Sequence, residues 1–151
     1  MENRIPPPII GLFSIFLVWA TASLLPGLGQ NLPLASALAA VLAVIGFAIA
    51  GAGVVGFRKA QTTVNPLTPE QATSLVSGGI YRLTRNPMYL GMLLVVIASG
   101  IFWQHLVALA VGAVFFFAYI NRFQVTPEER AMEKLFGDEF RTYCESVRRW
   151  L

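Results

Sequence analysis

Charge is missing from two long stretches of this chain, and that feature constrains its fold more than any other. No Asp, Glu, Lys or Arg falls within residues 5–57 or within residues 86–121, which are runs of 53 and 36 residues. A helix that crosses a bilayer needs about 20 apolar residues, with about 17 as the lower limit. The first run is therefore long enough for two membrane spans, and the second for two short ones.

The same distribution argues against a soluble enzyme, a nucleic-acid-binding domain and a secreted disulfide scaffold. Cys144 is the single cysteine and His105 the single histidine, so they cannot form an intrachain disulfide or complete a structural zinc site of four ligands. We therefore expect no metal and no nucleic-acid partner. The first apolar stretch ends in Pro26 and Gly27 and lacks a small-residue cleavage site, so we interpret it as a retained helix.

Turn residues divide the two uncharged runs into four predicted spans, at about residues 9–25, 34–57, 87–103 and 106–121. Asn86 is placed to cap the third span, and Pro87 suits its first helical position. The last two spans are short for a hydrocarbon core of about 30 Å, so we expect them to tilt or to extend past it. The pattern predicts a single-domain, all-α integral membrane protein, residues 1–151, with about four transmembrane helices.

Basic residues indicate how these spans are oriented. Arg4, the loop 58–85 and the segment from Arg122 onward carry one, four and six of the 11 Lys and Arg residues, and the two opposite connections carry none. By the positive-inside rule, both termini and the middle loop are predicted to be cytoplasmic. In a prokaryote the membrane would be the plasma or inner membrane.

Two cytoplasmic segments carry the signature of a helix start. Residues 68–71 (Thr-Pro-Glu-Gln) and 126–129 (Thr-Pro-Glu-Glu) both match a capping box with proline at the first helical position. The first predicted helix would end near Ser77. In the second, Glu129 is expected to be the reciprocal partner of Thr126. Glu128 has no such structural role, which makes it the better candidate for a ligand contact.

The second predicted cytoplasmic helix is interrupted by Gly137 and continues as an amphipathic segment. Apolar residues recur there at helical spacing, so this face should lie on the membrane surface or against the middle loop; they are Phe140, Tyr143, Cys144, Val147 and Leu151. Trp150 with Arg148 and Arg149 suits an anchor at the membrane interface.

Several motifs have a simpler structural explanation than a chemical one. Residues 51–56 match the dinucleotide fingerprint G-x-G-x-x-G, but they end an apolar helix and do not follow a strand. Small residues recur on one face of this helix and favour close helix packing; they are Ala39, Ala43, Gly46, Ala50 and Gly53. We interpret His105 as a turn residue, Cys144 as a small apolar residue and residues 115–117 as packing aromatics.

The middle loop concentrates polar residues beside the start of the third span, with Glu128 and Glu129 across the hairpin. Such a constellation can bind a polar cofactor while the spans hold an apolar substrate. A set of solvated interfacial charges is equally compatible with the pattern.

Two segments carry a family resemblance. Residues 79–91 (GIYRLTRNPMYLG), followed after one hairpin by Glu128-Glu129, Leu135-Phe136-Gly137 and residues 147–151 (VRRWL), resemble the isoprenylcysteine carboxyl methyltransferase and phospholipid methyltransferase superfamily. The lead-in residues 62–66 and Leu75-Val76 resemble it too. The similarity covers roughly residues 58–151.

The resemblance implies a membrane methyltransferase that uses S-adenosylmethionine without a Rossmann domain. The cofactor would lie at the cytoplasmic end of the last two spans, within residues 58–151, and a lipophilic acceptor would enter from the bilayer. The implied cofactor contacts are Leu75, Val76, Tyr81, Arg85, Asn86, Pro87, Met88, Tyr89 and Glu128. Candidates for contact with the acceptor are Arg58, Asn65 and Arg122. No catalytic residue is assigned.

The resemblance leaves the identity of the methyl acceptor open. The eukaryotic carboxyl methyltransferases have an arginine, aimed at the substrate carboxylate, where this chain has Gln124. An isoprenylcysteine-like, a phospholipid-like or another small apolar acceptor is therefore compatible with the resemblance. Two alternatives are an NADPH-dependent reductase of the sterol-reductase type and a non-catalytic membrane partner protein.

Overall fold

The computed structural model describes residues 5–29, 31–60 and 73–151, and all regular structure within them is helical. Five α-helices are α1 (Pro7–Leu24), α2 (Ala35–Lys59), α3 (Pro87–Phe102), α4 (Leu106–Ile120) and α5 (Thr126–Ser146). Shorter turns are η1 (Pro26–Leu28), η3 (Gly79–Arg82) and η4 (Asn121–Val125), the last of which is π-helical. The all-α prediction is confirmed, and each predicted span coincides with one helix to within two residues at either end.

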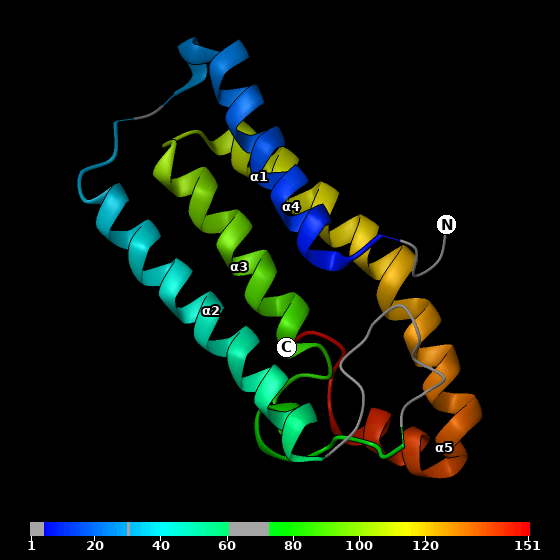
Figure 1. Ribbon diagram of the computed structural model, residues 1–151. Coiled ribbons are helices and arrows are strands. Elements are labelled where there is room, and N and C mark those ends of the chain that lie inside the picture. The colour runs from blue at the N-terminus through cyan, green and yellow to red at the C-terminus, as the bar shows by residue number, and fades with distance from the viewer. Residues whose placement is uncertain (1–4, 30, 61–72) are drawn as a thin grey trace.

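Helices α1 to α4 lie side by side, and α3 packs between α2 on one side and the α1–α4 pair on the other (Figure 1). Within the described residues, three helices are long and apolar enough to cross a membrane: α1, α2 and the continuous helix that begins with α4. Helix α3 has 16 residues, which gives it a length of about 24 Å. The chain is thus a membrane protein built from three to four apolar helices.

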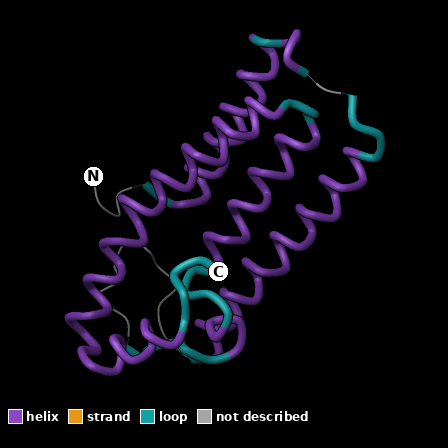
Figure 2. Tube along the Cα trace, turned by 180° about the vertical axis from the view of Figure 1, so that it is seen from behind, coloured by secondary structure: helices purple, strands orange, loops and turns teal. Residues whose placement is uncertain are grey.

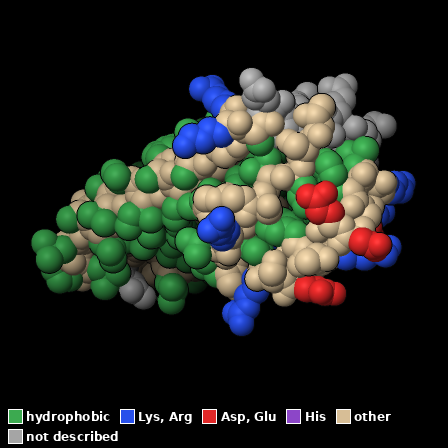
Figure 3. All heavy atoms as spheres, turned by 90° about the horizontal axis from the view of Figure 1, so that it is seen from below, with side chains coloured by type: hydrophobic (Ala, Val, Ile, Leu, Met, Phe, Trp, Pro, Cys, Tyr) green, Lys and Arg blue, Asp and Glu red, His purple; other side chains and the backbone are tan. Residues whose placement is uncertain are grey.

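Large apolar side chains cover the outside of this bundle. Leu12, Phe47 and Val114 are 68%, 66% and 66% exposed, and an apolar surface of this extent is stable in lipid but not in water. Figure 3 shows hydrophobic side chains over the bundle and charged side chains at one end of the molecule. That charged end contains η3, the end of α2 and helix α5.

The contact between α2 and α3 depends on glycine. A Cβ atom on Gly91 would lie 2.3 Å from the carbonyl oxygen of Gly46, and one on Gly53 would lie 2.8 Å from Cγ of Met88. The small-residue face of α2 therefore lets the two backbones approach closely, as helices do in membranes. The G-x-G-x-x-G match lies inside α2, so the helix-packing interpretation is correct.

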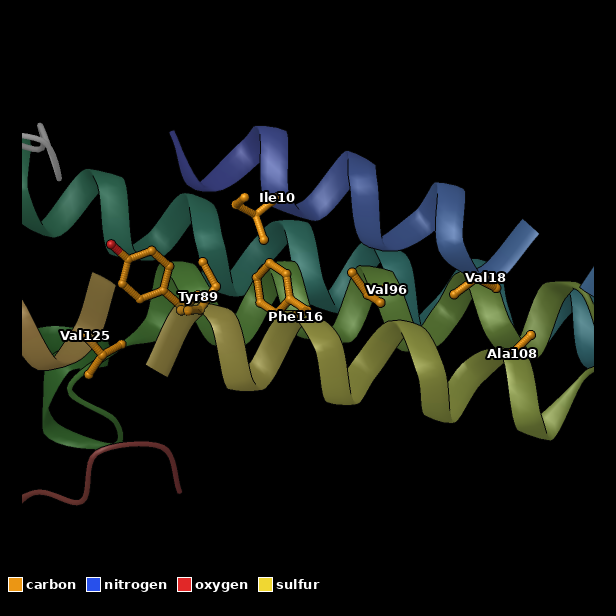
Figure 4. Packing of buried hydrophobic residues seen from close by; sticks show 8 residues of the cluster. Ile10, Val18, Tyr89, Val96, Ala108, Phe116 and Val125 are labelled. Carbon is orange, nitrogen blue, oxygen red and sulfur yellow. The ribbon is translucent and has the colours of Figure 1, made fainter. Parts of the chain in front are cut away.

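A core of buried apolar side chains joins α1, α3 and α4 (Figure 4). Val18, Val96 and Phe116 are among its fully buried members. At the turn between α3 and α4, Nδ1 of His105 accepts a hydrogen bond from the Ala108 amide at 3.1 Å, and its Nε2 lies 2.9 Å from the Leu25 carbonyl oxygen. His105 is therefore a structural turn residue, as predicted.

The predicted capping box at Thr126 is wrong. Helix α4 passes without a break through the π-helical turn η4 into α5, and Thr126 itself has helical angles. Its hydroxyl donates to the Asn121 carbonyl oxygen at 2.7 Å, and Glu129 pairs elsewhere. Because a π turn widens the helix, it can accommodate Pro127, which lacks an N–H group and would otherwise end the preceding helix.

Gly137 interrupts α5 as predicted, with φ +52° and ψ −121°. A positive φ is readily adopted by glycine, and here it turns the second half of α5 back beneath the ends of α2 and α3 (Figure 2). The helix ends at Ser146, so Val147 and Leu151 lie in an irregular segment, not in the helix.

The helix predicted from residue 68 to about 77 is not formed in its described part. Residues 73–78 are not helical, and residues 68–71, with the capping motif, lie outside the described residues. The N-terminal Arg4 lies outside them too.

Candidate cofactor site

A hydrogen bond between a tyrosine and a glutamate lies at the centre of the candidate site. Tyr89, in the first turn of α3, donates its hydroxyl proton to a carboxylate oxygen of Glu128, at the start of α5. The Tyr89 side chain is buried and Glu128 is half-buried. Figure 4 shows Tyr89 at one end of the apolar core. Two predicted cofactor contacts, 39 residues apart in sequence, are therefore brought together.

Glu128 has no ion-pair partner among the described residues. It follows the membrane-spanning α4, and burial raises the pKa of Glu128 to about 8, while the Tyr89 hydrogen bond lowers the pKa and the nearby Glu129 charge raises it. Removing a carboxylate from water without a cation is unfavourable. A ligand that supplies a positive charge or hydroxyl donors would therefore be stabilised beside it.

The neighbouring Glu129 is in the opposite situation. Nε of Arg149 donates to its carboxylate at 3.0 Å, and the Arg149 Nη2 contacts its second oxygen. Arg85 completes the pairing with a distance of 3.2 Å from Nη2 to a Glu129 oxygen. Glu129 is thus neutralised by two arginines, and this pairing replaces the capping role predicted from sequence.

Arg85 and Asn86 hold the start of α3 in place. The Asn86 side-chain amide donates to the Arg149 carbonyl oxygen at 2.8 Å, so it occupies the predicted N-cap position without capping the helix. Arg85 contacts Glu129 and the sulfur of Cys144. These contacts fix the start of α3 against the segment that follows α5, and Nε of Arg85 is buried without a hydrogen-bond partner among the described residues.

Tyr81, Leu75 and Val76 form a second cluster with the far half of α5. Tyr143 donates its hydroxyl proton to the Tyr81 carbonyl oxygen at 2.7 Å, and the Tyr81 ring packs edge-on against Phe57 at 5.5 Å. Burial raises the pKa of the Tyr81 hydroxyl far above its usual range, and Tyr143 and Glu128 add to the rise. The Tyr81 hydroxyl donates to the Gly53 carbonyl oxygen of α2 at 3.5 Å.

Pro87 and Met88 contact α2 where Gly53 leaves room for them. The predicted contacts on α3 thus divide into two kinds. Pro87 and Met88 pack against α2, whereas Tyr89 faces Glu128.

The candidates for acceptor contact are less well grouped. Arg58 is exposed at the end of α2, and Arg122 is exposed on η4 with its guanidinium 5.6 Å from the centre of the Phe123 ring. Asn65 lies outside the described residues. Gln124 is buried and donates to the Ile5 carbonyl oxygen at 2.8 Å, which ties η4 to the residues before α1.

Sequence reasoning missed the role of Arg149. It was expected to anchor the chain at the membrane interface, but its guanidinium binds Glu129 and Asn121. Trp150 packs on Phe117 with ring centroids 5.0 Å apart. Two features of the sequence could have suggested this pairing: the acidic pair Glu128-Glu129 and the basic pair Arg148-Arg149. They come together only because the chain turns at Gly137.

Comparisons with known proteins identify the family of this chain. Residues 34–139 match the family described as phospholipid methyltransferase. Protein-S-isoprenylcysteine O-methyltransferase A of Arabidopsis thaliana is 29% identical over 127 residues, which cover 82% of this chain and 62% of the plant protein. An uncharacterized protein of Haemophilus influenzae is 42% identical over 64 residues, which cover 42% of this chain and 100% of that protein. No solved structure matches.

The family match covers α2, α3, α4 and the first part of α5, with Tyr89, Glu128 and Glu129 among the matched residues, and leaves out α1. It favours the methyltransferase interpretation over a sterol-type reductase or a non-catalytic partner protein. The chain therefore belongs to the phospholipid methyltransferase family.

Proposed function

We propose that this protein uses S-adenosylmethionine to methylate a lipophilic acceptor that enters from the bilayer. One observation carries the proposal: Glu128 is a half-buried carboxylate without an ion pair among the described residues, and it accepts a hydrogen bond from Tyr89 at the polar end of an apolar bundle. A cofactor site of this family must join a polar ligand to an apolar substrate, and this junction of α3 and α5 offers both environments.

The polar groups of this site suit S-adenosylmethionine. The cofactor carries an ammonium, a sulfonium and two ribose hydroxyls, any of which would be favoured beside the Glu128 carboxylate. No side chain caps the N-terminus of α3 among the described residues, so its first amide groups suit the methionyl carboxylate. Leu75, Val76 and Tyr81 would enclose the cofactor from the side of the middle loop.

When bound, the cofactor supplies an activated methyl group that an acceptor can take by in-line displacement. The protein's own residues would align the two reactants and exclude water. Glu128 and Tyr89 would fix the cofactor, and Arg85 and Asn86 would keep the start of α3 against the segment that follows α5. Pro87 and Met88, packed on α2, would stop α3 from sliding.

We propose the same orientation that the basic residues predict, with both termini and the middle loop on the cytoplasmic side and the cofactor-binding part within residues 58–151. The acceptor class is a lipophilic molecule with a nucleophilic oxygen, nitrogen or sulfur. The relative in Arabidopsis is named for isoprenylcysteine, which makes a prenylated thioether with a carboxylate the first acceptor to test. Arg58, Arg122 and Asn65 remain candidates for contacts with it.

Equilibrium dialysis of the detergent-purified protein tests the cofactor. Tritiated S-adenosylmethionine should be retained and displaced by S-adenosylhomocysteine, whereas tritiated NADPH should not be retained. Retention of NADPH alone would support the reductase alternative, and retention of neither by folded protein would contradict the proposal. With the tritium in the methyl group, transfer to an organic extract of the native membranes then identifies the acceptor fraction.

A further inference from the structure

A short non-helical segment returns to the start of α3. We call residues 147–151 the return segment; it follows the end of α5 and lies beside the lower end of α3 (Figures 1 and 2). The Arg148 carbonyl oxygen accepts a hydrogen bond from the Arg85 amide at 3.1 Å. The Arg149 carbonyl oxygen accepts from the Asn86 side chain at 2.8 Å and from the Thr84 hydroxyl at 3.4 Å. The main chain of the return segment is thus bonded to residues 84–86.

The Arg149 side chain extends these contacts to two other elements. Its guanidinium binds both oxygens of Glu129 on α5 and donates to Oδ1 of Asn121 on η4 at 3.3 Å. A planar guanidinium bound through two nitrogens fixes direction as well as distance. Arg149 therefore joins the start of α3, the π-helical turn and the start of α5.

The residues that Arg149 holds are direct neighbours of the Tyr89–Glu128 pair. Tyr89 follows Asn86 by three residues in the first turn of α3, and Glu128 directly precedes Glu129 on α5. Helix α5 continues α4 beyond the bundle (Figure 1), so contacts at its base decide how far Glu128 lies from α3. A movement of about 1 Å in a binding group is enough to weaken its action strongly.

The charges around Glu128 also point to Arg149. The Glu129 carboxylate lies close enough to Glu128 to disfavour its ionisation, and Arg149 and Arg85 neutralise Glu129. The other groups that act on Glu128 are Tyr89 of α3 and Tyr81 of η3. Loss of the Arg149 charge would leave Glu129 less compensated and make Glu128 harder to ionise.

We propose that Arg149 is a positioning residue for cofactor binding: it fixes Glu128 against Tyr89 by joining Glu129, Asn121 and the Asn86 side chain across three elements. The proposal rests on the proposed function, because it concerns the same site. Arg149 itself would touch neither cofactor nor acceptor.

The adjacent Arg148 provides a matched control, because its side chain is exposed and only its main chain joins the network. Arg149→Ala, Arg149→Lys and Arg148→Ala would be compared by calorimetric titration with S-adenosylhomocysteine, well below the unfolding temperature of each variant. Arg149→Ala should weaken binding by about tenfold or more, whereas Arg148→Ala should stay within about twofold. Arg149→Lys, which keeps the charge but not the two-pronged geometry, should fall between them.

The pH dependence of binding separates positioning from mere stabilisation. Binding that requires ionised Glu128 should begin at higher pH in Arg149→Ala than in the wild type, and at unchanged pH in Arg148→Ala. If Arg149→Ala does not fold, the Arg149→Lys titration decides. Wild-type affinity and pH profile in the Arg149 variants would overturn the proposal, while failure of the wild type to bind would instead contradict the proposed function.

Discussion

The α2–α3 contact and the junction of α3 with α5 are both close, but they are built from opposite kinds of residues. In the bundle, Gly46 and Gly91 remove side chains so that two backbones meet. At the junction, Arg85 and Arg149 both form ion pairs with Glu129. Apolar helices in lipid gain little from hiding surface, so shape determines their packing. Helices that end in water can be joined by directed ion pairs, which place single side chains accurately.

The junction also contains a contrast between two neighbouring carboxylates. Glu129 is neutralised by two arginines, and Glu128 has only a tyrosine hydrogen bond among the described residues. A carboxylate paired with cations helps to hold the fold together. A partly buried carboxylate without a cation lowers stability until a ligand binds it. Adjacent identical residues thus acquire different roles because Gly137 returns the chain beside only one of them.

The largest loss of stability is expected when the glycine contact between α2 and α3 is disrupted. In Gly91→Ala the new Cβ would lie 2.3 Å from the Gly46 carbonyl oxygen and 2.8 Å from the Ala50 amide nitrogen. Because backbone atoms cannot move aside, we expect destabilisation of about 3 kcal/mol or more. Gly51→Ala is the control, since nothing lies within 4 Å of its Cβ, and it should raise stability slightly. Thermal unfolding in detergent measures both; similar midpoints would contradict the glycine-based packing.

A smaller effect is expected at the junction. Glu129→Gln removes the charge that Arg85 and Arg149 share, and we expect a loss of about 1–2 kcal/mol because the site is partly open to water. Glu133→Gln is the control: its partner Arg141 is 62% exposed, so the loss should not exceed about 0.5 kcal/mol. Chemical unfolding curves compare the two variants. Equal losses would mean that the Glu129 pairing is an ordinary surface contact.

The third prediction concerns the pH dependence of stability. Burial raises the pKa of Glu128 to about 8, so the folded protein binds a proton more tightly there than the unfolded chain does. Stability of the ligand-free protein should therefore fall as pH rises from about 5 through about 8. In Glu128→Gln this fall should be shallower, because the replaced side chain does not ionise. Unfolding midpoints of the wild type and Glu128→Gln across this pH range measure the difference. Parallel curves for the two proteins would contradict the view that the Glu128 carboxylate lacks a compensating charge.

Much of the fold could be predicted from sequence because lipid imposes simple rules. Uncharged runs, Pro87 and Gly137 locate the helices and the kink, and the small residues of α2 indicate which face packs. The prediction of a capping box at Thr126 failed because the same residues also suit a continuous helix in which a proline directly follows a widened π turn. The pairing of Glu129 with Arg149 could not be predicted, since it depends on the direction in which Gly137 turns the chain. The Tyr89–Glu128 contact was not predicted either: the family resemblance implied both residues as cofactor contacts, and only the structure brings them together.

The most direct test of the account is the affinity of S-adenosylhomocysteine for the wild type, Glu128→Gln and Glu145→Gln, measured by calorimetric titration in detergent. Glu145 is an exposed acid on the same helix, so its substitution controls for the loss of one negative charge. The account predicts binding by the wild type and Glu145→Gln, and affinity at least about tenfold weaker, or about 1.4 kcal/mol, in Glu128→Gln. Equal affinities in all three proteins would contradict the assignment of Glu128 to the cofactor.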